Sequence, residues 1–171
     1  MKKFLLLFCF FTSLGFAQES SIFSRKHEVK VGAIKLLAGP ILEGTYEYIH
    51  SPDFTYGVSI LGKLDSNNDY YEDFSVTPFA RFYFQESKEF GAKGLFVEGF
   101  AKYSTGYFDY DSYAIHKEYS AAALGISVGQ KWINRTGFVF EMLAGVGRTI
   151  GSANYKPDFI FRGDLSLGYR F

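Results

Sequence analysis

The residues with the greatest catalytic potential gather between Gly106 and Ser120. They are Asp109, Asp111, Ser112, His116, Glu118 and Ser120. A serine, a histidine and an acid that converge in space can catalyse acyl transfer or hydrolysis of a lipid ester. Their order in this segment fits no catalytic motif, however, and loops are ordinarily rich in aspartate and serine. A lipid-modifying enzyme built around His116 is therefore an alternative hypothesis; we predict no catalytic residue and expect the chain not to be an enzyme.

Metal and cofactor chemistry has little support in the sequence. Acidic residues cluster in two polar segments, but they lack the ligand spacing of a calcium-binding loop. These acids are Asp65, Asp69, Glu72, Asp73, Asp109 and Asp111. The sequence contains no phosphate-binding glycine loop, zinc-protease motif or nucleotide fingerprint. We therefore predict no cofactor and no metal site.

Most charged residues alternate with apolar ones. The pattern is clearest over residues 159–171, where the residues of one face are Phe159, Phe161, Gly163, Leu165, Leu167, Tyr169 and Phe171. Arg162, Asp164 and Arg170 fall on the other face. Side chains of a strand point alternately to its two faces, whereas a helix would spread these residues around its circumference. The segment is therefore predicted to be a β-strand.

The same alternation predicts seven further strands. Their ranges are 27–38, 41–50, 54–65, 74–85, 95–105, 119–132 and 138–149. The first is less regular, because Lys35 falls on its apolar face. Strands of roughly 10 to 13 residues exceed the usual five or six of soluble proteins and match the 9–11 that a tilted membrane-spanning strand needs. Eight long strands indicate an antiparallel barrel.

The connections between these strands alternate in length. Residues 51–53 and 134–137 are short turns, whereas 66–73, 106–118 and 151–158 are longer polar loops. Short turns at one rim and long loops at the other are typical of outer-membrane barrels. Two connections depart from this pattern, a short one at 38–40 and a long one at 86–94. Tyrosines in the loops could form a binding surface; they are Tyr70, Tyr71, Tyr107, Tyr110 and Tyr113.

Two eight-stranded barrels fit this alternation. A soluble lipocalin-type barrel turns its apolar face inward, whereas a membrane barrel turns it towards lipid and fills its lumen with polar groups. Aromatic residues near the strand ends, such as Trp132, Phe138, Phe74 and Tyr103, resemble the aromatic girdles of a membrane barrel. The polar face is rich in glycine, which leaves room in a narrow lumen. We therefore predict a transmembrane β-barrel.

In this orientation the charged residues of the strands share the lumen. The acidic ones are Glu28, Glu43, Glu47, Glu98, Glu141 and Asp164, and the basic ones are Lys30, Lys63, Arg81, Lys102, Lys131, Arg162 and Arg170. An eight-stranded barrel is only wide enough for side chains to fill it, and an unpaired buried charge costs several kcal/mol. We therefore predict a lumen plugged by ion pairs; a narrow ion or small-solute pore is the alternative. Lys35 is expected to face lipid near a rim.

The first 17 residues form a separate segment. Lys2 and Lys3 precede the apolar run from Phe4 to Phe11, and Ala17 offers a small residue at a cleavage position. This layout predicts a secretory signal peptide at 1–17, a short periplasmic segment at 18–26 and a barrel at 27–171. Cleavage would remove Cys9, the single cysteine. The balance of 18 basic and 18 acidic residues argues against nucleic-acid binding.

The ending Leu167-x-Tyr169-x-Phe171 resembles the C-terminal signal by which outer-membrane proteins reach their assembly machinery. With the strand pattern over 27–171, the sequence resembles the small eight-stranded outer-membrane barrels of the OmpA/OmpX type and the related β-barrel domain families of unknown function. The resemblance implies an up-and-down barrel in the outer membrane with both termini in the periplasm. It also implies a monomer whose partners are the lipid bilayer, lipopolysaccharide and the assembly machinery. It implies no particular activity.

From these patterns we expect a structural or surface-interaction role. The external loops are then 66–73, 106–118 and 151–158, and the lumen is filled by charged side chains.

Overall fold

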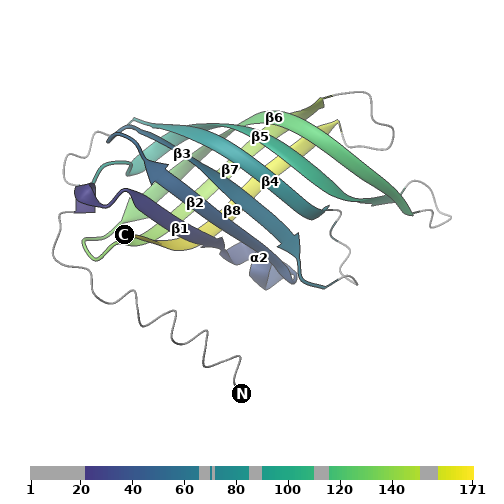
Figure 1. Ribbon diagram of the computed structural model, residues 1–171, viewed down its shortest axis with the longest axis horizontal. Coiled ribbons are helices and arrows are strands. Elements are labelled where there is room, and N and C mark those ends of the chain that lie inside the picture. Colours follow the sequence, from purple (N-terminus) through teal and green to yellow (C-terminus); the bar gives the residue numbers. More distant parts are fainter. Residues whose placement is uncertain (1–21, 66–69, 71, 85–89, 110–115, 151–157) are drawn as a thin grey trace, which may run out of the picture.

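The structure is a computed structural model that describes residues 22–65, 70, 72–84, 90–109, 116–150 and 158–171. It contains one closed β-barrel (Figure 1). The strands are β1 (His27–Gly32), β2 (Ile41–Ile49), β3 (Phe54–Lys63), β4 (Glu72–Tyr83), β5 (Gly94–Asp109), β6 (His116–Ile133), β7 (Phe138–Ile150) and β8 (Phe159–Arg170). A 3-10 turn (Ile22–Ser24) precedes β1, and a short helix α2 (Ala33–Ala38) follows it.

Each strand pairs antiparallel with its neighbour in sequence, and β8 closes the barrel on β1. In the closing ladder Glu28 lies opposite Arg170 and Val31 lies opposite Leu167. Backbone hydrogen bonds between His27 and Phe171, of 3.2 and 2.8 Å, extend this seam to the end of the chain. The predicted all-β, eight-stranded antiparallel barrel is therefore confirmed.

The barrel has two different rims. The terminal rim holds the start of β1, the end of β8, and the short turns 51–53 and 134–137 (Figure 1). In the second of these turns the Asn134 side-chain oxygen accepts backbone hydrogen bonds from Thr136, Gly137 and Phe138. The loop rim holds α2, and beyond it the hairpin of β5 and β6 projects (Figure 1).

The prediction of a strand over 27–38 is wrong beyond Gly32. Residues Ala33–Ala38 form α2 instead, and their sequence, Ala-Ile-Lys-Leu-Leu-Ala, is rich in good helix formers. The predicted lipid-facing position of Lys35 is wrong for the same reason. Helical rotation turns its side chain inward, where the ammonium group forms an ion pair with Glu43 and the side chain is only 15% exposed.

The prediction of a loop over 106–118 is also wrong at both ends. β5 continues to Asp109 and β6 begins at His116, and the two residues are partners in the ladder. Backbone pairing between two long neighbouring strands here outweighs the polar composition of the segment. The remaining part, 110–115, lies outside the described residues. β4 likewise begins at Glu72, inside the predicted loop 66–73.

Glycine on the inner face of β6 makes room for large side chains from β5. A Cβ on Gly125 would lie 2.6 Å from the backbone oxygen of Val146 and would also collide with the ring of Phe100. Gly99, on the outer face of β5, has open space around its Cβ position. Alanine substitutions at these two glycines therefore distinguish the effect of packing in the lumen from the effect of intrinsic strand propensity.

We predict that Gly125→Ala destabilises the barrel by about 1–3 kcal/mol, because the methyl group overpacks the lumen wall. Gly99→Ala should be neutral or stabilising by about 0.5 kcal/mol, because alanine loses less entropy on folding. Urea unfolding of the purified barrels measures both values. Equal midpoints for the two variants would contradict this account of the inner wall.

Candidate functional site: the charged lumen

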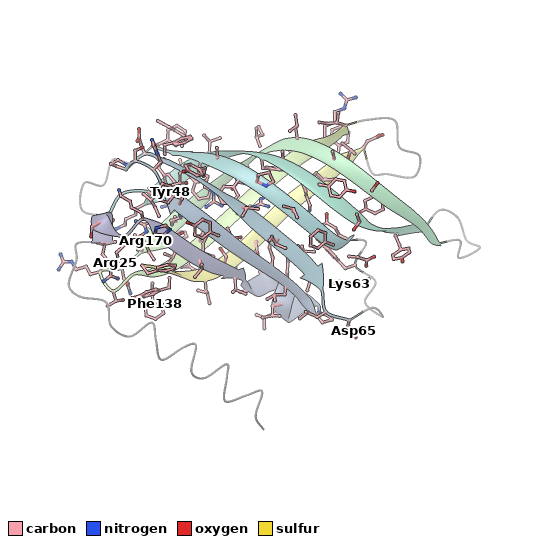
Figure 2. The ribbon with its side chains drawn as sticks, in the orientation of Figure 1. Arg25, Tyr48, Lys63, Asp65, Phe138 and Arg170 are labelled. Carbon is pink, nitrogen blue, oxygen red and sulfur yellow. The ribbon has the colours of Figure 1, made fainter. Side chains whose placement is uncertain are left out.

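Strand alternation places charged side chains on the inside of the barrel. Among the described residues, six buried acids (Glu28, Glu43, Glu47, Glu72, Glu98, Glu141) stand with six buried bases (Lys30, Arg81, Lys102, Lys131, Arg162, Arg170). Figure 2 shows that the charged residues extend along the barrel, from Arg170 near the terminal rim to Lys63 near the loop rim. Within this set the formal charges balance, as the low polarity of a closed interior requires.

Glu47 lies at the centre of this arrangement. Its carboxylate accepts hydrogen bonds from Lys30 at 2.5 Å, Arg81 at 2.6 Å and Lys131 at 2.7 Å. Glu141 lies on the opposite side of two of these cations and accepts bonds from Lys30 at 2.7 Å and Arg81 at 2.8 Å. These five side chains come from strands β1, β2, β4, β6 and β7, so the cluster ties most of the barrel wall together across the lumen.

Glu28 and Arg170 continue the network to the terminal rim. Glu28 forms ion pairs with Lys131 at 2.9 Å, Arg170 at 3.0 Å and Lys30 at 3.3 Å. Arg170 also donates hydrogen bonds to the backbone oxygens of residues 90–92. The connection before β5 is thereby held against the inside of the barrel, where Ala92 is fully buried.

Glu98 and Arg162 carry the network towards the loop rim. Glu98 pairs with Arg81 at 2.7 Å and with Arg162 at 3.1 Å. Arg162 in turn lies 3.6 Å from Glu43 and donates a hydrogen bond to the Ser59 hydroxyl. A continuous chain of opposite charges therefore runs from the central cluster to Glu43, the partner of Lys35.

Two further ion pairs lie near the loop rim. Lys102 pairs with Glu72 at 2.6 Å, and Lys63 lies 3.4 Å from Asp73. Asp164, which the sequence assigned to the lumen set, lies apart from the central cluster against the start of α2. A Cβ on Gly32 would collide with its carboxylate, which would have to move to admit a side chain there.

Sequence reasoning missed several members of the lumen. Glu72 was assigned to a loop and Lys35 to the outer face, and the inward-facing Phe79, Phe96 and Phe100 were not recognised. The guanidinium of Arg81 lies 4.3 Å from the ring centre of Phe79 and 4.5 Å from that of Phe96, which is cation–π geometry.

Strand alternation supplies a signal for the inner aromatic residues, because Phe96 and Phe100 fall on the same face as Glu98 and Lys102. Phe96 lies opposite Gly129 and Phe100 lies opposite Gly125 in the β5–β6 ladder. A phenylalanine on the polar face, opposite a glycine of the next strand, indicates a ring that covers the glycine.

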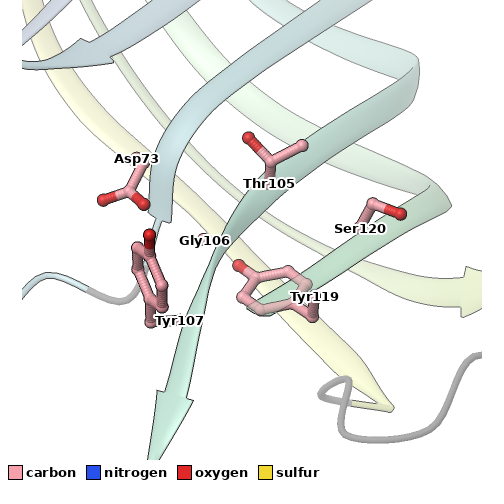
Figure 3. A pocket seen from close by; sticks show the side chains of 6 residues that line it. All are labelled: Asp73, Thr105, Gly106, Tyr107, Tyr119 and Ser120. Carbon is pink, nitrogen blue, oxygen red and sulfur yellow. The ribbon is translucent and has the colours of Figure 1, made fainter. Parts of the chain in front are cut away.

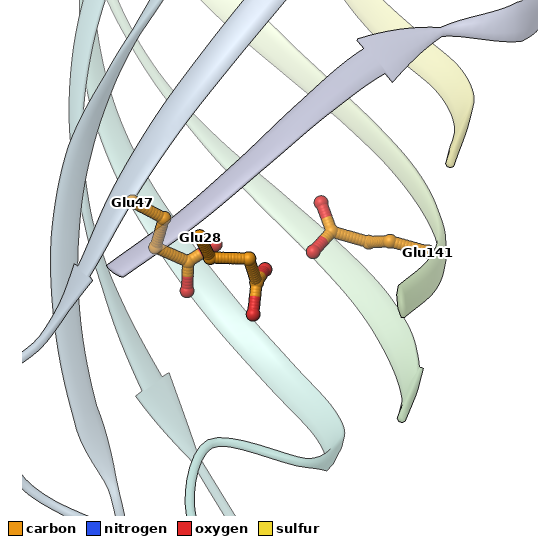
Figure 4. A group of neighbouring side chains, drawn as sticks. All are labelled: Glu28, Glu47 and Glu141. Carbon is orange, nitrogen blue, oxygen red and sulfur yellow. The ribbon is translucent and has the colours of Figure 1, made fainter. Parts of the chain in front are cut away.

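Glu28, Glu47 and Glu141 approach one another closely enough to resemble a metal site (Figure 4). One carboxylate oxygen from each lies within 4.8 Å of the others. The cations of Lys30, Arg81 and Lys131 already occupy the space between them at hydrogen-bond distance. The three charges are therefore balanced by side chains, and the cluster acts as a structural junction.

The remaining predicted residues lie outside the lumen or outside the described side chains. Leu167 and Phe171 point outwards, and Tyr169 packs edge-on against Phe138 with ring centres 5.7 Å apart. His116 and Asp109 form the last ladder pair of the β5–β6 hairpin, but their side chains are not among the described ones. Asp111 and Ser112 lie outside the described residues.

Comparison of the chain with protein-family models, curated proteins and solved structures gave no match. Among the helices of the described residues, none has both the length and the apolar character needed to cross a membrane.

We predict that Arg81→Met lowers the free energy of unfolding by about 3–5 kcal/mol. The change removes one cation from three buried carboxylates, those of Glu47, Glu98 and Glu141. Denaturant unfolding of the purified barrel measures the loss.

Two variants control for this result. Arg148→Met, at an exposed arginine, should change stability by no more than about 0.5 kcal/mol. Adding Glu98→Gln to Arg81→Met should recover part of the loss, since it removes one of the uncompensated charges. Equal losses at both arginines would argue against a lumen held by ion pairs.

Proposed function

We propose that this chain is an integral outer-membrane β-barrel protein with a structural or surface-interaction role. In this proposal residues 1–17 are a signal peptide, 18–26 a short periplasmic segment and 27–171 the barrel. The partners are the lipid bilayer, lipopolysaccharide and the barrel assembly machinery, which would recognise Leu167, Tyr169 and Phe171. The protein is monomeric and not an enzyme.

The observation that carries the proposal is the reversed polarity of the barrel. Each of the eight strands carries exposed apolar side chains on its outer face, and Ile126 and Phe161 have 65% and 77% of their surface exposed. The belt includes Val29, Tyr46, Ile60, Phe82, Leu95, Val128, Val146 and Leu167. Monomeric proteins in water rarely expose a continuous apolar patch larger than a few hundred Å². An apolar belt around the whole circumference is therefore expected to face the hydrocarbon core of a membrane.

The interior supports the same conclusion. A lipocalin-type barrel keeps apolar residues inside for a ligand, whereas here Glu47, Arg81 and Lys131 are fully enclosed within the barrel. Outer-membrane barrels have polar interiors and apolar outer surfaces. The charged lumen and the apolar belt are thus two aspects of one arrangement.

Aromatic residues lie near both rims, where the two membrane interfaces are expected if the apolar face points towards lipid. Near the terminal rim, exposed Trp132 stacks on Phe140 with ring centres 5.3 Å apart, and Phe138 and Phe84 are also exposed. Near the loop rim, Phe74, Tyr103 and Phe159 face outwards. Amphipathic rings favour the headgroup level of a bilayer. The apolar belt is therefore bordered at both rims by aromatic residues, as proposed for a membrane barrel.

The two alternative functions receive no specific support. The chain of ion pairs from Arg170 to Glu43 crosses the lumen, which favours a plugged barrel over a pore. The enzyme hypothesis depends on His116, whose side chain is not described. We therefore assign the function to the loop rim, beyond which the hairpin of β5 and β6 projects.

We predict that Ile126→Lys destabilises the barrel in lipid vesicles by about 2–4 kcal/mol, since it places a charge near the middle of the apolar belt. Gln130→Lys, on the same strand and face but nearer the terminal rim, should cost only about 0–1 kcal/mol. Unfolding in vesicles measures both. A water-soluble monomer that tolerates both substitutions equally, and that fractionates away from outer membranes, would refute the membrane proposal.

We also predict that the native barrel shows no steady ion conductance in planar bilayers, because paired side chains close its lumen. The double variant Arg81→Ala, Glu98→Ala removes a central pair and should admit ions if it folds, as judged by a gel shift between unheated and heated samples. Steady conductance of the native protein that changes on neutralising Arg81 or Glu98 would favour the pore hypothesis.

A further inference from the structure

At the loop rim β5 extends further than its neighbour β4, and we call this offset between the two strands the step. β4 begins at Glu72, opposite Gly106, whereas β5 and β6 continue as a hairpin to Asp109 and His116. At this step the structure has a hollow of about 460 Å³. Its lining residues are Asp73, Thr105, Gly106, Tyr107, Tyr119 and Ser120 (Figure 3). The volume lies within the range of about 300–1,000 Å³ that is usual for small-molecule sites.

The lining is dominated by hydroxyl groups. Thr105, Tyr107 and Ser120 each carry one, and a hydroxyl can both donate and accept a hydrogen bond, whereas the Tyr119 hydroxyl is buried. In Figure 3 the Tyr107 hydroxyl points towards Asp73 and the Tyr119 hydroxyl towards Gly106. Groups of this kind match a ligand that itself carries several hydroxyls on adjacent carbons.

Tyr107 also supplies apolar surface. Tyr119 is buried, while Tyr107 is 45% exposed and can offer a ring to a ligand. An aromatic face carries partial negative charge and attracts the weakly positive C–H groups of a saturated ring. Gly106 lies opposite Tyr119 in the ladder and brings no side chain into the hollow.

The charge of the hollow argues for a neutral ligand. Among the described lining residues Asp73 is the single charged one, and the ammonium group of Lys63 lies 3.4 Å from that carboxylate. This pairing leaves neither a cationic site for an anion nor a bare carboxylate for a cation. The lining therefore combines hydroxyls, one compensated acid and an aromatic face.

We propose that this hollow binds a neutral sugar residue. That it faces the cell exterior rests on the function proposed above, whereas the binding chemistry rests only on the lining residues. The sugar could belong to lipopolysaccharide of the same membrane or to a free glycan. A monosaccharide with a dozen heavy atoms should bind with a Kd on the order of 1 mM, as expected from typical binding energies per atom.

Saturation-transfer NMR on the folded full-length barrel tests the proposal. The protein is kept in an amine-oxide detergent, because sugar-headed detergents would compete for the hollow. The probes are glucose, galactose and N-acetylglucosamine, with glucuronate as the charged comparison. We expect transfer to at least one neutral sugar and at least fivefold less transfer to glucuronate.

Two variants locate the site and one controls for it. Tyr107→Ala should reduce the transfer at least fivefold, and Thr105→Val, which keeps the size of the side chain but removes its hydroxyl, at least twofold. Tyr103→Ala is the matched control, because Tyr103 is an outward tyrosine of the same strand, 51% exposed, that does not line the hollow. It should leave the transfer unchanged.

A further arm separates the two sources of sugar. Transfer to the delipidated oligosaccharide of lipopolysaccharide would assign the ligand to the membrane itself, and transfer to the free sugars alone would assign it to a soluble glycan. Absence of transfer to every neutral sugar, or equal loss in Tyr103→Ala and Tyr107→Ala, would overturn the proposal. Either result would leave the vesicle test of Ile126→Lys unaffected, so the two proposals fail independently.

Discussion

The barrel depends on the neutralisation of charge inside a closed, narrow cylinder. Strand alternation directs Glu47, Arg81 and Lys131 inward, where the wall of eight strands leaves little room for water. Each carboxylate there needs a cation at hydrogen-bond distance, because a single unpaired buried charge costs several kcal/mol. Glu47 meets this requirement with three cations from three strands. The ion pairs therefore fix how the strands face one another across the lumen.

The narrow lumen also limits the size of the side chains that can pack inside it. The rings of Phe96 and Phe100 lie over Gly129 and Gly125 of the neighbouring strand, where any side chain would collide with them. The outer surface lacks this constraint at Gly99, which has open space around its Cβ position. The loop rim, where β5 and β6 extend beyond β4, lies outside the central charge cluster of the lumen.

Much of the fold could be predicted from the sequence. Alternation between two faces is a local property of a strand, so the eight strands and the residues that share a face, such as Glu98 and Lys102, follow from spacing alone. The lumen set could be predicted for the same reason, with Glu43, Arg81, Glu141 and Arg162 among its members. The membrane orientation, the ending at Phe171 and the role remain predictions, since periodicity by itself does not distinguish lipid from water.

The tertiary structure decided what spacing leaves open. One of these features is the path of the chain after β1. The ladder with β2 ends at Val31 and the ladder with β8 at Gly32, and a helix then turns Lys35 inward to Glu43. Another was the choice of partners, because Arg162 meets Glu98 only when β8 closes on β1 and brings distant strands around one axis. Sequence thus determined which residues share the inner face, through the two-residue period of a strand. Closure of the barrel determined which of them touch, because the contacts across the lumen depend on the register and diameter of the whole sheet.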